Sequence, residues 1–410
     1  MTQQRAMGSP ASTDGAGGAS KSVLVALMLV AFNLRTPLTS LPTLVTDIES
    51  TTGLGKVGIG ALTTIPILMM GLLAFLVPSL AARFGLIRVV WFAVAVLALA
   101  SAIRLGGAQP AVLFLSAFLA GAGIAMAGGC VPAIVRQQLP HRIGLVTGLW
   151  TMSLMLGAAI SASLTVPLEH LLGSWQAALA FWAVPTAVAW VIWTVVERRE
   201  RVAAPSAARQ VTSLSDLPWR SSTAWALTAF LAFNSILYYT TVAWLAPSLE
   251  ARGLTQAQAG AAFGLTSAVG IIAALVFPPL LQRSQHPRVL LAAVVLATCT
   301  SLLGIAFVPL LATAFWMALF GVANTAWFTM GQTLIGMLST DGGHAARLTA
   351  MVYAGMYLMA ATGPVTAGAL LQATGSWASA FAILAGMSLL GLGAVRWLHP
   401  SGRGTGRPSV

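Results

Sequence analysis

Twelve long apolar stretches dominate the sequence, and each is long enough to cross a lipid bilayer as a helix. A crossing helix needs roughly 20 apolar residues, and its backbone must satisfy its own hydrogen bonds in hydrocarbon. The alternation of period two that a β-barrel requires is absent. We therefore expect an all-α membrane protein with twelve transmembrane helices, at Ser22–Val45, Val57–Leu80, Ile87–Ile103, Ala111–Val135, Gly144–Leu168, Ser174–Val196, Ser222–Pro247, Ala257–Leu281, Val289–Pro309, Ala312–Leu338, Ala346–Leu371 and Ala378–Leu398.

The scarcity of charge supports this class. Only 7% of the 410 residues are charged, whereas a soluble domain has about 25%. This excludes an ordinary cytosolic enzyme, a nucleic-acid-binding protein and a secreted disulfide scaffold. The two cysteines, Cys130 and Cys299, lie in apolar stretches and are expected to pack there. We expect no metal site, no cofactor and no nucleic acid partner.

The positive charges gather on one side of the predicted spans. If the N-terminus is cytoplasmic, 17 of the 21 lysines and arginines fall in cytoplasmic segments. The opposite side holds only Lys56, Arg104 and Arg252, and Arg35 falls inside the first span. By the positive-inside rule, both termini are expected in the cytoplasm of an inner-membrane protein. The net charge of +12 then reflects membrane orientation.

The two halves of the chain repeat each other at an offset of about 200 residues. Ala-Phe-Asn at 31–33 recurs at 232–234, and Gly-Ser-Trp at 173–175 recurs at 375–377. Parallel repeats of this kind build transporters whose solute site lies between the halves. The expected organisation is a disordered cytoplasmic tail (1–20), a six-helix half (21–196), a cytoplasmic linker (197–221), a second six-helix half (222–399) and a cytoplasmic tail (400–410).

Six plus six helices, a basic linker and the short basic loop at 82–88 resemble the major facilitator superfamily over residues 22–398. The arginines and the glycine of that loop fit the superfamily motif. Ala82 stands where the motif has an acid, so the charge-relay role of that acid is not carried over. Within the superfamily, Asn-Leu-Arg-Thr-Pro-Leu-Thr-Ser-Leu-Pro at 33–42 is similar to the signature of the cyanate porter and 2-nitroimidazole transporter group (CynX/NimT-like).

Arg35 is the one charge that the sequence places deep in a span, far from any acid. An arginine there costs at least about 2.5–3.5 kcal/mol on insertion scales. We therefore expect Arg35 to face a wet cavity and to attract an anionic or electronegative solute. The alternative is that it binds helix carbonyls and fixes packing. Arg35 and Thr39 share one helical stripe, which we favour for the solute, while Asn33, Thr36 and Ser40 share another, favoured for helix contacts. Asn33 remains among the candidate site residues.

Polar and aromatic residues of later spans complete the expected site. The resemblance implies that spans one, four, seven and ten line the cavity. Amides and aromatic rings can hold a small polar ligand, or they can join helices. The candidates are Asn234, Tyr238 and Thr241 in the seventh span, Asn324, Phe328 and Gln332 in the tenth, and Tyr353 and Tyr357 in the eleventh as further ligand or gate residues.

Four arginines recur at equivalent places in the two halves. Arg83 and Arg88 follow the second span, and Arg283 and Arg288 follow the eighth. We expect them either to clamp one state through cytoplasmic hydrogen bonds or only to satisfy the positive-inside rule.

These features predict a secondary transporter that works by alternating access on a small anionic or strongly polar solute. There is no P-loop for ATP, and no histidine or carboxylate at mid-membrane depth for an enzyme. Coupling stays open between a facilitator, symport with a proton that the solute carries, and coupling through a peripheral acid such as Asp47 or Glu169. The alternatives are efflux of drug-like compounds such as nitroimidazoles, and a ligand-binding membrane sensor without flux.

Overall fold

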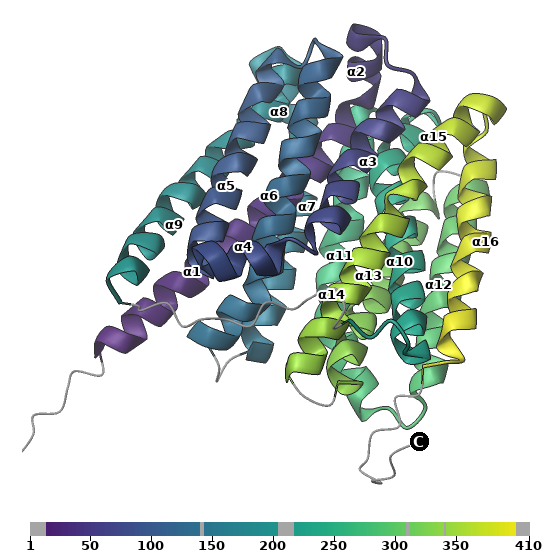
Figure 1. The fold of residues 1–410 in the computed structure, drawn as a ribbon. Helices are drawn as coiled ribbons and strands as arrows, with labels where there is room; N and C mark the ends of the chain where they lie inside the picture. Colours follow the sequence, from purple (N-terminus) through teal and green to yellow (C-terminus); the bar gives the residue numbers. More distant parts are fainter. Residues whose placement is uncertain (1–13, 140–142, 204–216, 309–311, 340–341, 399–410) are drawn as a thin grey trace, which may run out of the picture.

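The computed structural model describes residues 14–139, 143–203, 217–308, 312–339 and 342–398, and these fold into helices and short connections without a strand. The helices form two sets, the N-terminal helices α1–α9 and the C-terminal helices α10–α16, which lie side by side (Figure 1). We call the end of the bundle where α1 begins the tail side and the opposite end the α2 side. The elements are α1 (Asp14–Ser40), η1 (Leu41–Leu44), α2 (Val45–Thr52), α3 (Lys56–Leu73), α4 (Val77–Phe84), α5 (Leu86–Ala102), η2 (Ile103–Gly106), α6 (Pro110–Gln138), α7 (Ile143–Leu172), α8 (Trp175–Phe181), α9 (Ala183–Ala203), α10 (Ser222–Glu250), α11 (Gln256–Arg283), α12 (Pro287–Phe307), α13 (Thr313–Met337), α14 (Gly342–Ala360), α15 (Thr362–Thr374) and α16 (Trp377–Val395).

Eleven helical segments of the described residues are long and apolar enough to cross a membrane. The tenth predicted span, which the structure builds as α13, is not among them. At 25 residues α13 measures about 37 Å, which is enough to cross, and it carries Asn324 and Gln332 among its apolar residues. The all-helical membrane fold predicted from the sequence is confirmed, and α13 is one of the helices expected to line the site.

Prolines divide four of the predicted spans, which we had expected to be continuous. A proline lacks the N–H that would bond the carbonyl four residues earlier. Helix α8 ends at Phe181, four residues before Pro185, and α14 ends at Ala360, four residues before Pro364. The first span breaks likewise into α1, η1 and α2 around Pro42, and the second into α3 and α4 before Pro78.

The ends of the two halves differ in detail from the expected boundaries. Helix α1 begins at Asp14, so residues 14–20 of the expected disordered tail are helical, and α9 carries the sixth span on to Ala203 within the expected linker. A helix that is already nucleated grows by one hydrogen bond per added residue, which favours such extensions. The remainder of the two tails and the linker segment 204–216 lie outside the described residues.

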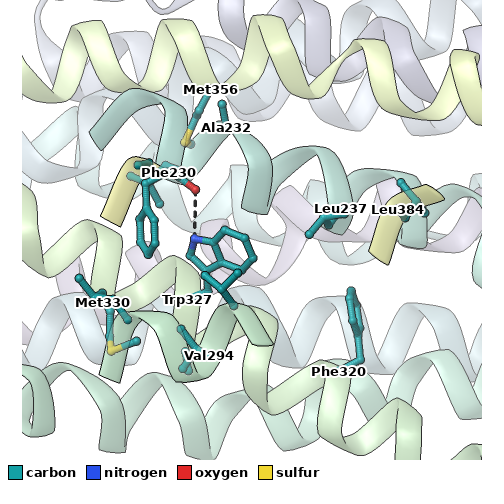
Figure 2. Close-up of a cluster of buried hydrophobic side chains, with 14 of the residues drawn as sticks. Phe230, Ala232, Leu237, Val294, Phe320, Trp327, Met330, Met356 and Leu384 are labelled. Atoms are coloured by element: carbon teal, nitrogen blue, oxygen red, sulfur yellow. Dashed lines mark hydrogen bonds between the residues drawn. The ribbon is translucent and has the colours of Figure 1, made fainter. Parts of the chain in front are cut away.

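Each set of helices encloses its own packed interior. In the C-terminal set, the indole nitrogen of Trp327 donates to the carbonyl of Phe230 at 3.0 Å, and their ring centroids lie 5.4 Å apart (Figure 2). Both side chains are fully buried. In hydrocarbon, helices associate through close packing and hydrogen bonds of this kind, because lipid tails are as apolar as the side chains. The rigid interior of each set fixes the residues that face the other set.

The repeated Gly-Ser-Trp tripeptides take the same local structure in both sets. The hydroxyl of Ser174 caps α8 by accepting from the backbone of Ala177, and the hydroxyl of Ser376 caps α16 by accepting from Ser379. A serine at this position satisfies a backbone N–H that has no partner inside the helix. The sequence repeat therefore corresponds to a repeated structural feature.

The two sets meet closely on the α2 side. The Thr46 hydroxyl donates to Glu250 at 2.8 Å, and the Gln256 amide donates to Asp47. Gly260 packs against α7 so tightly that an added Cβ would lie 2.5 Å from the carbonyl oxygen of Ala162. We call this contact, between α2, α3 and α7 on one side and α10, α11 and α15 on the other, the seam.

Candidate functional site

Arg35 lies at the centre of the contact between the two sets of helices. Its Nη1 donates to the hydroxyl of Tyr239 at 3.1 Å. Its guanidinium carbon lies 5.2 Å from the ring centroid of Tyr238 and 5.7 Å from that of Tyr239, both on α10. Such cation–π contacts stabilise a cation by about 0.5–2 kcal/mol but do not neutralise it. Neither ion pair found among the described residues includes Arg35, so its charge is met only by neutral groups.

The four tyrosines of the protein form a chain of neighbouring rings that begins at this arginine. The ring centroids of Tyr238 and Tyr239 are 5.1 Å apart, those of Tyr239 and Tyr357 are 6.2 Å apart, and those of Tyr357 and Tyr353 are 6.0 Å apart. The chain of rings therefore runs from α10 to α14. It ends where the Tyr353 hydroxyl donates to the side-chain oxygen of Gln332 on α13, at 2.9 Å. We call Arg35, the four tyrosines and Gln332 the tyrosine cluster.

Four of the predicted site residues carry a buried polar atom that has no hydrogen-bond partner within the described part of the chain. Leaving such a group unsatisfied costs roughly 1–3 kcal/mol. Amide nitrogens can only donate, and hydroxyls can also donate, so an acceptor would satisfy every one of these atoms. They are the Tyr238 hydroxyl, the Thr241 hydroxyl, Asn324 Nδ2 and Gln332 Nε2.

Three other predicted site residues are instead occupied with joining helices. The Asn33 amide nitrogen donates to the carbonyl of Leu29, and its oxygen accepts from the Thr186 hydroxyl of α9 at 2.9 Å. The Thr39 hydroxyl pairs with that of Ser161 on α7 at 2.6 Å. Asn234 Nδ2 donates to the backbone carbonyl of Asn324. These contacts lie within one set of helices.

The favoured stripe of Arg35 and Thr39 is therefore divided in the structure. Four residues advance a helix by a full turn and about 40° more, which is enough to turn Thr39 toward α7 while Arg35 faces α10. Phe328 is half-buried and packs against the interior of the C-terminal set. No group of histidine, cysteine or carboxylate side chains suited to a metal occurs in the described ranges.

Arg104 is a fully buried guanidinium, although its place in the sequence predicts a position outside the membrane on the α2 side. Its side chain is only 2% exposed. Its Nε donates to the Ser116 hydroxyl at 2.9 Å, its Nη2 to the carbonyl of Pro37 at 3.0 Å, and its Nη1 to the Ser40 hydroxyl at 3.4 Å. Arg104 is therefore buried by protein although it lies at the end of the third span. The third span continues into η2, where Arg104 contacts α1 and α6. In the sequence, a charge that directly follows an apolar span and has no acid nearby indicates such a buried position.

The contacts that the structure describes for the repeated arginines lie within their own set of helices. Arg88 pairs with Glu197 at 3.4 Å, and Arg288 donates to the carbonyl of Leu398 at 3.1 Å. Arg88 thus joins the start of α5 to α9, and Arg288 joins the start of α12 to the residues that follow α16. Arg83 lies 5.2 Å from the ring centroid of its neighbour Phe84, and Arg283 is exposed at the end of α11. In this conformation the contacts described for them do not clamp the two sets together.

Comparison with known proteins places this arrangement in a family. The model of the Major Facilitator Superfamily matches residues 23–337 and, in a second match, residues 253–409. The chain is 31% identical to the 2-nitroimidazole transporter of Escherichia coli (strain K12) over 374 residues, which are 91% of this chain and 94% of that protein. It is 25% identical to the cyanate transport protein CynX of the same organism over 355 residues, 87% of this chain and 91% of that protein.

The fold also matches a solved transporter structure. A bacterial homologue of the human lysosomal transporter Spinster, in an inward-facing and occupied conformation, superimposes with a TM-score of 0.70 at 15% sequence identity. The match covers 92% of this chain and 96% of that one. The resemblance to the cyanate and 2-nitroimidazole group drawn from the first span is confirmed. The chain belongs to the major facilitator superfamily and is a multi-pass membrane transporter rather than an enzyme.

Proposed function

We propose that this transporter moves a small anionic or strongly polar solute across the inner membrane by alternating access, with the tyrosine cluster as its solute site. The observation that carries the proposal is the uncompensated charge of Arg35 among buried polar atoms that lack acceptors. A solute rich in acceptor atoms satisfies both needs at once. A guanidinium can hold a carboxylate-like group by two parallel hydrogen bonds, which gives orientation as well as affinity.

The seam supports alternating access. Its hydrogen bonds and close glycine contacts hold the two sets of helices together on the α2 side, so a solute at Arg35 is shielded from that side. In transporters built from parallel repeats, one half rocks against the other around a central site. We assign the tail side to the cytoplasm, because most of the basic residues lie in segments on that side.

Efflux of flat nitro-aromatic compounds is the second candidate. The 31% identical relative is a 2-nitroimidazole transporter, and the ring chain of Tyr238, Tyr239, Tyr357 and Tyr353 offers faces and edges to a flat ring. A nitro group presents two acceptor oxygens, as a carboxylate does. The two candidates differ in whether the ligand is a small anion or polar solute, or a flat aromatic ring.

The mode of coupling follows from what surrounds the site. The tyrosine cluster contains no carboxylate or histidine, so the described residues there offer no carrier for a coupled proton. A proton that the solute itself carries agrees with this composition. A peripheral acid is the other route: Asp47 receives the Gln256 amide across the seam, and Glu169 ends α7 on the same side.

Uptake of labelled solute into liposomes containing the purified full chain tests the proposal. Cyanate, small carboxylates and 2-nitroimidazole are the solutes to compare. Arg35→Ala should insert and fold normally but lose most of the flux, and Arg35→Lys should recover little if bidentate geometry matters. Arg252→Ala is the matched control, because Arg252 binds the carbonyls of Ile305 and Val308 away from the cluster.

Undiminished flux in both Arg35 variants would disprove the role of this residue. Saturable binding of a solute by the wild-type protein without any time-dependent accumulation would instead indicate a membrane sensor.

A further inference from the structure

Arg104 carries a full positive charge in neutral surroundings. Its described partners are two hydroxyls and one backbone carbonyl, and neither ion pair of the described residues includes it. Neutral acceptors satisfy N–H groups, but they do not offset the cost of taking a charge out of water, which amounts to several kcal/mol for a buried ion. A charge kept in such a place is a functional site by default in a membrane protein.

A small cavity beside Arg104 connects it with the tyrosine cluster. The cavity has a volume of about 20 Å³, which is room for about one water molecule. Arg104, Thr63 of α3 and Tyr239 of α10 are polar side chains of its lining, and Pro37 of α1 also lines it. Tyr239 is the residue whose hydroxyl accepts from Arg35. The cavity therefore lies where the two sets of helices meet, and both Arg104 and Tyr239, the partner of Arg35, line it.

The order of residues along α1 places this cavity on the α2 side of Arg35. Its wall uses Pro37, Leu38 and Leu41, which follow Arg35 in the chain toward α2. Between Arg35 and the closed contacts of the seam, a solute would therefore meet Arg104 next. If the halves separate on the α2 side, this cavity is among the first spaces to widen, because both sets of helices line it.

We propose that Arg104 is a second anion-binding residue, which receives a small monovalent anion from Arg35 as the transporter opens on the α2 side. This inference rests on the proposed function and specifies its solute class. An anion that passes from one guanidinium to the next keeps a counter-charge at each step. Without Arg104 it would have to leave Arg35 for water through a region of low dielectric constant, where an unpaired charge is costly.

A purely structural clamp makes a different prediction. Arg104 joins α1, α5 and α6 through Pro37 and Ser116, so its loss could distort the site as a whole. Distortion would weaken every ligand to a similar degree. Loss of a counter-charge weakens an anion and leaves an uncharged ligand of similar polarity almost unaffected. The two roles are therefore separated by comparing a charged with a neutral probe.

The experiment measures the affinity of the purified full chain for thiocyanate and for 2-nitroimidazole by tryptophan fluorescence and by thermal stabilisation. It is run in mildly acidic buffer, in which thiocyanate is an anion and the ring N–H of 2-nitroimidazole stays protonated, so that this ligand is neutral. We expect Arg104→Gln to weaken thiocyanate by about tenfold or more and 2-nitroimidazole by less than about threefold. Arg252→Gln is the matched control: it is also an arginine of the α2 side that binds carbonyls, but it does not line the cavity. It should leave both affinities unchanged.

Equal weakening of both probes by Arg104→Gln, or of neither, would overturn the inference. If that variant does not fold, Arg104→Lys is the variant to compare with wild type, because lysine keeps the positive charge but lacks the planar guanidinium group. Thiocyanate affinity within about threefold of wild type supports the anion role, and equal weakening of both probes contradicts it.

The wild-type protein separates this inference from the proposed function. Binding of 2-nitroimidazole without any binding of thiocyanate would overturn the inference and favour the efflux candidate. Binding of neither probe, nor of any solute in the liposome screen, would overturn the proposed function itself. Thiocyanate binding that Arg35→Ala abolishes and Arg104→Gln leaves intact would defeat only the role of Arg104.

Discussion

The polar residues of α1 and those of α10 and α13 all lie in long apolar helices, but they have opposite surroundings. On α1, Asn33 and Thr39 have partners on neighbouring helices of their own set. On α10 and α13, Tyr238, Asn324 and Gln332 keep buried atoms without a described partner. A polar residue in a membrane helix can join helices or bind a ligand. The two roles differ in whether its polar atoms already have hydrogen-bond partners in the protein.

Asn324→Leu provides the sharpest test of this comparison. Leucine keeps the branched shape of asparagine, although it is the bulkier side chain, and it removes the unpaired Nδ2, whose burial costs roughly 1–3 kcal/mol. We expect transport to fall by about tenfold to a hundredfold, while the thermal stability of the empty protein stays the same or rises. Liposome flux and a melting curve on the same preparation check both effects. A fall in stability together with flux would mean that Asn324 joins helices instead.

Tyr238→Phe removes one hydroxyl and keeps the ring beside Arg35. The cation–π contact at 5.2 Å remains, so stability should change little. We expect a loss of about tenfold in solute affinity, the amount that one good hydrogen bond to a charged or strongly polar ligand contributes. Titration of solute binding by thermal shift measures it. Tyr353→Phe is the control within the cluster, since its hydroxyl already has Gln332 as a partner.

Asn33→Leu should have the opposite profile. It breaks the contacts with Pro185 and Thr186 that hold α1 against α9. Hydrogen bonds between membrane helices contribute about 0.6 kcal/mol on average, so the loss of two should lower stability by about 1 kcal/mol. Flux per folded molecule should stay within about twofold of wild type. The repeat partner Asn234, which donates to the Asn324 carbonyl, is the matched residue for the same substitution. Loss of flux without loss of stability in Asn33→Leu would remove the distinction between the two regions.

Much of this fold could be predicted from the sequence because a membrane imposes few solutions. Long apolar stretches have to be helices, and the repeat at about 200 residues indicates two halves. The place of Arg35 follows from the cost of a charge in hydrocarbon. The breaks before Pro185 and Pro364 were visible as prolines, but a proline within a helix, such as Pro132 in α6, does not always end it.

The finer features of the site depend on contacts between distant residues, which a single sequence does not show. The sequence around Arg104 is typical of a loop, and its burial follows only from the packing of α1 and α6 against it. Thr39 reads as a neighbour of Arg35 until Ser161, distant in the sequence, is brought against it. Whether an asparagine is satisfied, like Asn33, or not, like Asn324, is likewise decided by the helix that packs beside it.

Thr39→Val should have the smallest effect of these substitutions. It is the strictest test of the rule that a polar atom with a hydrogen-bond partner in the protein does not bind the solute. The stripe that Thr39 shares with Arg35 predicts a contact with the solute, whereas in the structure its hydroxyl pairs with that of Ser161 and donates to the carbonyl of Arg35. Valine keeps the shape and removes one interhelical hydrogen bond, so stability should fall by no more than about 0.6 kcal/mol and solute affinity should not change. Ser161→Ala, which removes the other partner, should behave alike, and the double variant should cost little more than either single change. A tenfold loss of affinity in Thr39→Val alone would contradict this rule. It would mean that the Thr39 hydroxyl exchanges its bond with Ser161 for one with the solute during transport.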